Sequence, residues 1–268
     1  MSRLLVLKLG GSLLTDKSQP YSLRMDVLKV ACAEVASCLR SGLIDKLVVV
    51  HGVGSYGHPP VIQYKLYKGF IDSAQLLPLS RTQSKVNELR AAVTSCLQDE
   101  GLAVNLFHTS SIAVAKKGRI QTMDLEAVRG FLEIGMVPVL GGDMVRDSEM
   151  GFSVGSGDQV AAILTKQLKA SELVFATDVS GVYDSDPKSS RNAKLVADVS
   201  LTSLGNVDLA GGSQGDASGA MRGKLLALAD LAPELERGLR MSIISMMEPG
   251  RLTRLLRGEP VEHTSIRP

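Results

Sequence analysis

The chain of 268 residues is 44% hydrophobic and 22% charged, and its 30 lysines and arginines nearly balance 28 acidic residues, giving a net charge of +2. It has no tryptophan, 4% aromatic residues and no long basic run, so it offers neither the phosphate-neutralising surface nor the stacking platform that nucleic-acid binding needs. No apolar run approaches the length of a membrane span, so we expect neither a nucleic acid nor a membrane as partner.

The three cysteines, Cys32, Cys38 and Cys96, are odd in number and lie in apolar segments without metal-ligand spacing. We interpret them as small buried side chains in a reducing compartment. An apolar strand begins within a few residues of Met1, which leaves no room for a signal peptide. These features predict a cytoplasmic protein.

The segment Leu4 to Lys17 reads as a buried strand that ends in a glycine turn. Lys8 interrupts the apolar run, and a buried ammonium group is costly unless an anion meets it. Gly10 and Gly11 allow close backbone approach, Ser12 is a further donor, and Lys17 is a second cation nearby. A bound phosphate group explains this pattern; the alternative is an edge strand whose lysine reaches water.

A helix predicted from Ser22 to Gly42 leads into a second buried strand, Lys46 to His51. Strand, helix and strand form a parallel crossover, so the loop after His51 should lie beside the first glycine turn. In that loop Gly52, Gly54 and Gly57 supply amides, with Ser55 among them, and His58 suits a hydrogen bond to an anionic oxygen. The alternative is a turn whose histidine caps the next helix.

The pattern continues with a helix or broken helix pair over Ala74–Gly101 and a strand over Ala103–Phe107. A helix follows from Asp124 to near Gly135. A strand over Val137–Leu140 then opens into Gly141, Gly142 and Asp143, and a hairpin is predicted over Met144–Val154. The segment Val61 to Phe70 mixes aromatic residues with lysines. It could line an apolar pocket with Leu76, Leu79 and Val86, or belong to a core or dimer face.

Gly157 and Asp158 precede a helix predicted over Gln159–Leu168. Asp158 could be a simple helix cap, or it could hold nearby lysines in place. A strand over Glu172–Thr177 opens into a loop with three acids, Asp178, Asp184 and Asp186, which could carry Mg²⁺, surround a nucleotide, or be a solvated turn.

The last third begins with a glycine-rich loop, Ala210 to Lys224, which is either a phosphate cradle before a helix or a flexible linker. A closing strand over Met241–Ser245 and a helix over Arg251–Gly258 follow. Because strands alternate with helices throughout, we predict a single α/β domain over 1–268, a three-layer α/β/α sandwich with a mainly parallel central sheet. Its halves, about 1–150 and 151–268, would bind acceptor and nucleotide respectively.

Six motifs in this order resemble those of the amino acid kinase superfamily: KLGGSLLTDK at 8–17, HGVGSYGHP at 51–59, GGD at 141–143, SGD at 156–158, TDVSGVYDSDP at 177–187 and DASGAMRGK at 216–224. The lysine of TDK, together with the glycine loop ending in histidine, most resembles the isopentenyl phosphate kinases. Fosfomycin kinases share the histidine. The sequence departs from the usual motifs at Val53, Ser218, Ala220 and His263.

The resemblance implies ATP-dependent phosphorylation of isopentenyl phosphate to isopentenyl diphosphate, with Mg²⁺ and a homodimer. Lys8 and Lys17 would stabilise the transferring phosphoryl group, His58 would hold the acceptor phosphate, and Asp158 would organise the lysines. The other implied contacts are Gly10, Gly11, Ser12, Gly54, Ser55, Gly57, Gly142, Asp143 and Gly157 for the acceptor, and Lys8, Gly10, Asp178, Gly181, Tyr183, Gly219 and Lys224 for the nucleotide. A fosfomycin or other small phosphonate kinase and a binding module without turnover remain alternatives.

Overall fold

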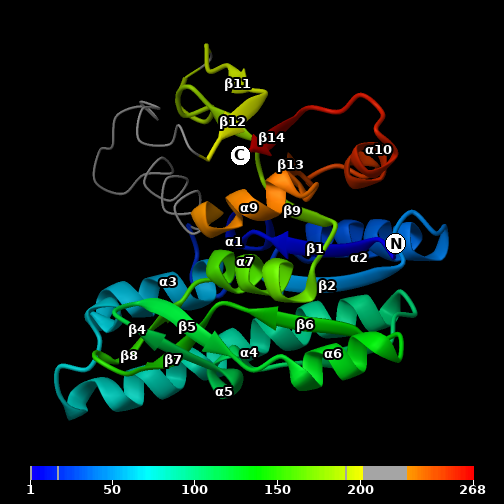
Figure 1. Ribbon diagram of the computed structural model, residues 1–268. Coiled ribbons are helices and arrows are strands. Elements are labelled where there is room, and N and C mark those ends of the chain that lie inside the picture. The colour runs from blue at the N-terminus through cyan, green and yellow to red at the C-terminus, as the bar shows by residue number, and fades with distance from the viewer. Residues whose placement is uncertain (1, 17, 191, 202–227) are drawn as a thin grey trace.

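A computed structural model describes residues 2–16, 18–190, 192–201 and 228–268 of the chain (Figure 1). Three residues of the expected site, Lys17, Gly219 and Lys224, lie outside the described residues. The glycine-rich loop predicted over 210–224 lies outside them as well.

The fold is built on an eight-stranded sheet with the order β12-β14-β13-β9-β1-β2-β6-β3. Neighbouring strands pair in parallel except at β13 and β14, so β12 and β14 run against the others. The strands are β1 (Leu4–Leu9), β2 (Lys46–His51), β3 (Val104–Leu106), β6 (Val137–Gly141), β9 (Glu172–Thr177), β12 (Asp198–Ser200), β13 (Arg240–Ser245) and β14 (His263–Arg267). The mainly parallel sheet predicted from the sequence is confirmed.

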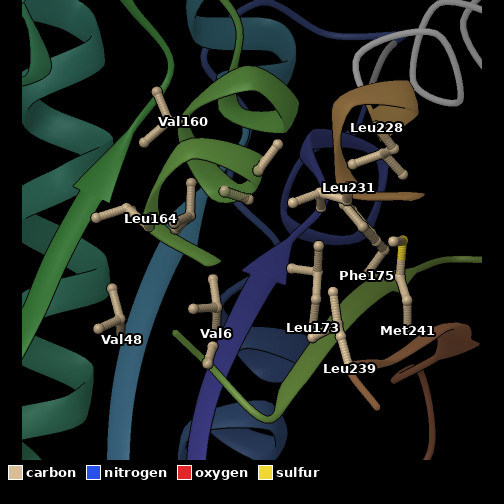
Figure 2. Close-up of a cluster of buried hydrophobic side chains, with 14 of the residues drawn as sticks. Val6, Val48, Val160, Leu164, Leu173, Phe175, Leu228, Leu231, Leu239 and Met241 are labelled. Carbon is tan, nitrogen blue, oxygen red and sulfur yellow. The ribbon is translucent and has the colours of Figure 1, made fainter. Parts of the chain in front are cut away.

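Helices cover both faces of this sheet, because the buried strands are apolar on both sides. Val6 and Phe175 belong to one core cluster with Val160 and Leu164 of α7, which Figure 2 shows packed together. Leu5, Leu7 and Leu9 belong to a second cluster with side chains of α2, α4 and α10. The helices are α1 (Gly11–Leu14), α2 (Met25–Arg40), α3 (Gly54–Gln63), α4 (Leu76–Asp99), α5 (Thr109–Ile112), α6 (Glu126–Glu133), α7 (Gly157–Leu168), α9 (Ala232–Glu236) and α10 (Arg251–Arg257), with 3-10 turns η1 (Leu66–Lys68), η2 (Ser73–Gln75) and η3 (Ala229–Leu231).

A separate four-stranded sheet, in the order β5-β4-β7-β8, is formed by residues between 113 and 155. Of this sheet, only the β7–β8 hairpin is predicted from the sequence. The buried Asp147 carboxylate stabilises both turns of this sheet by accepting amide hydrogen bonds from Gly118 and Met150. Its strands are β4 (Ala113–Lys116), β5 (Arg119–Met123), β7 (Asp143–Asp147) and β8 (Gly151–Gly155), and the short strands β10 (Val182–Tyr183) and β11 (Leu195–Val196) form a further pair.

Two local predictions are wrong. The segment after His51 is not a loop through His58, because α3 begins at Gly54 and contains Pro59 within it. Pro59 and Pro60 both lie beyond the first turn of α3, so each leaves one carbonyl of that turn without its usual helical amide partner. Ser22 does not cap α2, whose N-cap is Arg24 and has no side-chain cap; instead the amide of Ser22 bonds to the hydroxyl of Ser55.

Candidate active site

Lys8 is buried near the carboxyl end of β1, with 6% of its surface exposed. Successive side chains of a strand alternate between faces, so Lys8 follows Leu4 and Val6 toward the α7 side of the sheet. There its Nζ lies 3.0 Å from Oδ1 of Asp158. Asp158 stands in the first turn of α7, where the helix dipole also favours a carboxylate. The predicted strand with an embedded cation is confirmed, and its buried charge is paired.

The cap of α7 is Ser156, whose side chain accepts from the amide of Gln159. Asp158 is therefore not the N-cap, and its carboxylate faces the lysine instead. Of the two interpretations that the sequence leaves open, the lysine partner is the one found.

The first two glycine turns touch each other through their backbones. A Cβ on Gly11 would lie 2.5 Å from the amide nitrogen of Gly54, and a Cβ on Gly52 would lie 2.5 Å from that of Gly11. Thr15 joins the two turns: its hydroxyl donates to the carbonyl of Gly11 at 2.7 Å and accepts from the amide of Ser55 at 3.0 Å. Parallel pairing of β1 with β2 brings both turns to one sheet edge, as the crossover predicts.

Several predicted donors are already engaged in holding these turns. The amide of Gly10 bonds to the carbonyl of Ala176 at 2.8 Å, and the amide of Ser55 bonds to Thr15. The hydroxyl oxygen of Ser55 accepts from Ser22, which leaves its hydroxyl hydrogen for a ligand. Gly11, Ser12 and Gly54 stand at the first residues of α1 and α3, where helix amides have no partner within the helix.

The third glycine turn, at Gly141 and Gly142, packs against both the second turn and α7. The amide of Gly142 bonds to the carbonyl of His51 at 3.1 Å. A Cβ on Gly142 would lie 3.2 Å from the amide nitrogen of Gly157, and a Cβ on Gly157 would lie 3.0 Å from the carbonyl of His51. These two glycines thus permit close packing of backbone beside the Lys8 and Asp158 pair.

His58 lies on the exposed side of α3, one helical turn after Gly54 and therefore on the same face of that helix. Gly57 packs against the side chain of Val53 at the start of the same helix. α3 packs along α4, so His58 lies on a helix that contacts the next long helix of the chain.

On the other side of β1, Asp178 follows the end of β9. It forms an ion pair with Lys188, and hydrogen bonds from Lys188 and from the hydroxyl of Ser12 lower the pKa of its carboxyl against the opposing effect of burial. Ser12 thus connects the first glycine turn to the residue that follows β9. Gly181 packs on Thr264 of β14, where a Cβ would lie 2.2 Å from the threonine hydroxyl, and Tyr183 lies half-buried on β10.

Asp143 is occupied by protein groups. Its Oδ2 lies 3.3 Å from Nη2 of Arg90 in α4, and its carboxylate accepts hydrogen bonds from the amides of Ser110 and Met144. Arg90 is not among the residues predicted from the sequence, although an arginine between Leu89 and Val93 on the apolar face of a helix is a detectable signal. Thr15 and His51 are likewise absent from the predicted site.

An apolar cavity of about 370 Å³ opens between α4, β7 and β8. Of the residues proposed for a pocket, Phe70, Leu76 and Leu79 line it, whereas Tyr64 and Val86 do not. Met144 and Phe152 from the small sheet complete much of its wall. The cavity depends on β8, which is distant in sequence from the helices after His58.

The three cysteines are buried and unbridged, as predicted. In the part of the chain that the structure describes, no cluster of three or more histidine, cysteine or acidic side chains could hold a metal ion. No helix among these residues has the length and apolarity to cross a membrane.

The sequence model of the Amino acid kinase family matches residues 3–245. Over 98% of its length the chain is 35% identical to the isopentenyl phosphate kinase of Methanothermobacter thermautotrophicus, and it covers 98% of that protein. A solved structure described as "X-ray structures of isopentenyl phosphate kinase" aligns with a TM-score of 0.80 and 32% identity over 99% of each chain. The glutamate 5-kinase of Hydrogenovibrio crunogenus is 28% identical over 97% of this chain and 66% of its own length.

The likeness thus extends through both halves of the sheet, including every strand end that carries a glycine turn. This chain is a phosphotransferase that belongs to the amino acid kinase family, in the group of the isopentenyl phosphate kinases.

Proposed function

We propose that the protein transfers the γ-phosphoryl group of ATP to isopentenyl phosphate and releases isopentenyl diphosphate. The observation that carries this proposal is the buried Lys8 and Asp158 pair, at 3.0 Å, beside three glycine turns. Phosphoryl transfer depends mainly on alignment of the reactants and on cations around the transferring oxygens. A rigidly held ammonium group among closely packed backbones suits that requirement.

Lys8 would stabilise negative charge on the transferring phosphoryl group, with Lys17 as a second cation. Asp158 would orient Lys8 through their ion pair. The acceptor is a phosphate whose second pKa is about 6, so much of it is doubly ionised and nucleophilic at neutral pH. The transfer therefore needs no general base from the protein.

The acceptor phosphate would bind at the start of α3. The amides of Gly11 and Gly54, the hydroxyl hydrogen of Ser55 and the exposed His58 are the groups available to it there. The apolar cavity beside α4 would hold the isopentenyl tail. Phe70, Leu79 and Phe152 give it the apolar lining that a polar phosphonate does not need, which favours isopentenyl phosphate over fosfomycin.

ATP would approach from the β9 side, where Asp178 and Gly181 lie near the first glycine turn through Ser12. Tyr183, Gly219 and Lys224 would complete that half of the site. Mg²⁺ is commonly held by one or two carboxylates together with the substrate phosphates, and Asp178, which follows β9, would be the carboxylate on the nucleotide side. Bound with ATP, the ion would neutralise charge on the β- and γ-phosphates.

We further propose that two copies form a homodimer. The described residues include large exposed apolar side chains between positions 62 and 77, such as Ile62, Tyr67 and Leu77. Light scattering coupled to size-exclusion chromatography measures the assembly's mass, and a monomer at micromolar concentration would contradict this.

The test of the reaction is an ADP-release assay with Mg·ATP and, side by side, isopentenyl phosphate, dimethylallyl phosphate, fosfomycin and glutamate. We expect strong turnover with isopentenyl phosphate, alone or with its isomer. A preference for fosfomycin would contradict the tail assignment, and a preference for glutamate would contradict the acceptor class. No turnover on any of them would favour a binding module.

A further inference from the structure

A fully buried arginine lies behind the glycine turns, at a position that the reaction itself does not use. Arg90 has 0% of its surface exposed and projects from the middle of α4. Its guanidinium donates to four side chains: Asn87 Oδ1 at 2.7 Å, His108 Nδ1 at 2.7 Å, His51 Nε2 at 3.3 Å and Asp143 Oδ2 at 3.3 Å. A charged group is rarely buried so completely without paired and hydrogen-bonded partners.

The partners fix the protonation of the cluster. An arginine only donates, so His51 Nε2 must accept from it, and the remaining proton of the neutral ring lies on Nδ1. That Nδ1 then donates to the carbonyl of Gly52 at 3.2 Å. Burial first, and then the charge of Arg90, lower the pKa of His51 to about 3, so the ring stays neutral.

His51 and Asp143 are the residues that adjoin the second and third glycine turns. The ring of His51 fills the space beside Gly141, where a Cβ would lie 2.2 Å from the ring. The backbone carbonyl of His51 accepts a hydrogen bond from the amide of Gly142. Asp143 follows Gly142 directly and accepts the amide of Met144 at 2.8 Å. One guanidinium therefore contacts both turns, each through the side chain next to it.

We propose that Arg90 is a positioning residue, which holds the second and third glycine turns at the spacing that the acceptor phosphate requires. This inference rests on the proposed function, because that function defines the acceptor phosphate. The geometry of the turns can be tested without assuming the function. The planar guanidinium of an arginine has five donors and reaches all four acceptors here, whereas the compact ammonium of a lysine has three. The arrangement predicts that the spacing of the turns depends on the number of hydrogen-bond donors at this position, and not only on the positive charge beside Asp143.

The kinetic test compares Arg90→Lys and Arg90→Met with Val93→Ala. Val93 is equally buried on α4 but belongs to the opposite core cluster, so its truncation destabilises the fold without touching the turns. We expect at least a tenfold rise in KM for isopentenyl phosphate in Arg90→Lys, with KM for ATP within twofold of the wild type. If Val93→Ala shows an equal rise in KM for isopentenyl phosphate at a matched loss of Tm, then Arg90 has only a structural role. An equal rise in KM for ATP in Arg90→Lys would lead to the same conclusion.

The second measurement needs no turnover and therefore separates this inference from the proposed function. Histidine ring nitrogens labelled with ¹⁵N report the tautomer of His51, and backbone amide shifts report Gly52 and Gly142. We expect the Nδ1–H form in the wild type, because Nδ1 donates to the carbonyl of Gly52. In Arg90→Lys and in Arg90→Met/Asp143→Asn we expect a shifted Nε2 signal, because Nε2 loses its guanidinium donor; the double variant removes both members of the buried ion pair. Both variants should also shift the Gly52 and Gly142 amides, whereas Val93→Ala should not. Unchanged ring and glycine signals in a folded Arg90 variant would overturn the inference.

Discussion

At the scale of single residues, the site depends on charges placed where water is scarce. Lys8 is buried and bound to Asp158, while Arg90 is buried and bound to Asp143. The two pairs differ in surroundings, because Lys8 lies at the strand end beside the first glycine turn and Arg90 lies behind the other two turns. The first pair is the one that we propose meets a phosphate.

Replacing Lys8 with methionine should lower kcat by a factor of about 10² to 10³, since an ammonium group that acts mainly in the transition state contributes about 3 to 4 kcal/mol to it. Binding of ATP, measured by titration calorimetry, should change much less. Lys46→Met is the matched control, because Lys46 begins the neighbouring strand and lies at the opposite edge of the sheet. Equal losses in kcat and ATP affinity would make Lys8 a binding residue.

His51 predicts how stability depends on pH. Its pKa is lowered from 6.5 to about 3 by burial, then by the charges of Arg90 and Lys8, so between these values the unfolded chain binds the extra proton. Stability is therefore complete above pH 6.5 and is lost as the pH falls toward 3. From pH 7 to pH 5 the free energy of unfolding should fall by about 2 kcal/mol from this group.

Urea unfolding at a series of pH values measures that slope. In His51→Asn, which removes the titrating group and keeps a hydrogen-bonding side chain, the slope between pH 7 and pH 5 should be smaller by about the same 2 kcal/mol. An identical slope in wild type and variant would contradict the assignment of a neutral, buried His51.

At the scale of elements, the site is made by strand ends and helix starts that approach one another closely. β1, β2 and β6 are adjacent in the sheet, and a glycine lies at the end of β6 and directly after the ends of β1 and β2. The α7 helix packs over β1 and supplies Asp158 and Gly157. Side chains at these glycines would separate the elements, so the glycines set the distance between them.

Gly54→Ala tests this at the start of α3. Gly54 has φ of +46°, and a Cβ there would lie 2.0 Å from Oγ1 of Thr15. We expect a loss of stability above about 2 kcal/mol from strain and overpacking, together with weaker acceptor binding. Gly130→Ala in α6 is the control: nothing lies within 4 Å of its Cβ, so it should stabilise the helix by about 0.5 to 1 kcal/mol. Equal thermal midpoints for the two variants would contradict the predicted close approach.

At the scale of the whole molecule, the two halves share one sheet. β1 pairs with β2 of the N-terminal half on one side and with β9 of the C-terminal half on the other. Core side chains from both halves meet around α7, as Figure 2 shows for Val48, Val160 and Phe175. Separating the halves would expose one edge of β1, the facing edge of β9 and much of this cluster.

Calorimetric unfolding should therefore show one transition for the chain 1–268, which we propose to be a single domain. An ATP analogue that is not hydrolysed, at 100 times its Kd with Mg²⁺, should raise the free energy of unfolding of the whole unit by about 2.7 kcal/mol. Two resolved transitions, of which the nucleotide moves one, would show that the halves unfold separately.

The sequence by itself determined the alternation of strands and helices, the lysine within β1, and the order of the glycine turns. These are local features, because apolar periodicity, glycine and a charge inside an apolar run can each be read from neighbouring residues. The continuation of α3 through Pro59 could not be read in this way, because a glycine and proline run is typical of loops as well. Residues such as Lys17 and Lys224 stay predictions.

Only the tertiary structure decided which groups face one another. It placed Arg90 of α4 against His51 and Asp143, Thr15 between the first two turns, and β8 across the apolar cavity. These partners are far apart along the chain, and their contacts depend on how helices and the smaller sheet pack on the strand ends. Periodicity assigns a residue to a buried face, but packing in three dimensions selects the partner that lies within hydrogen-bonding distance of it.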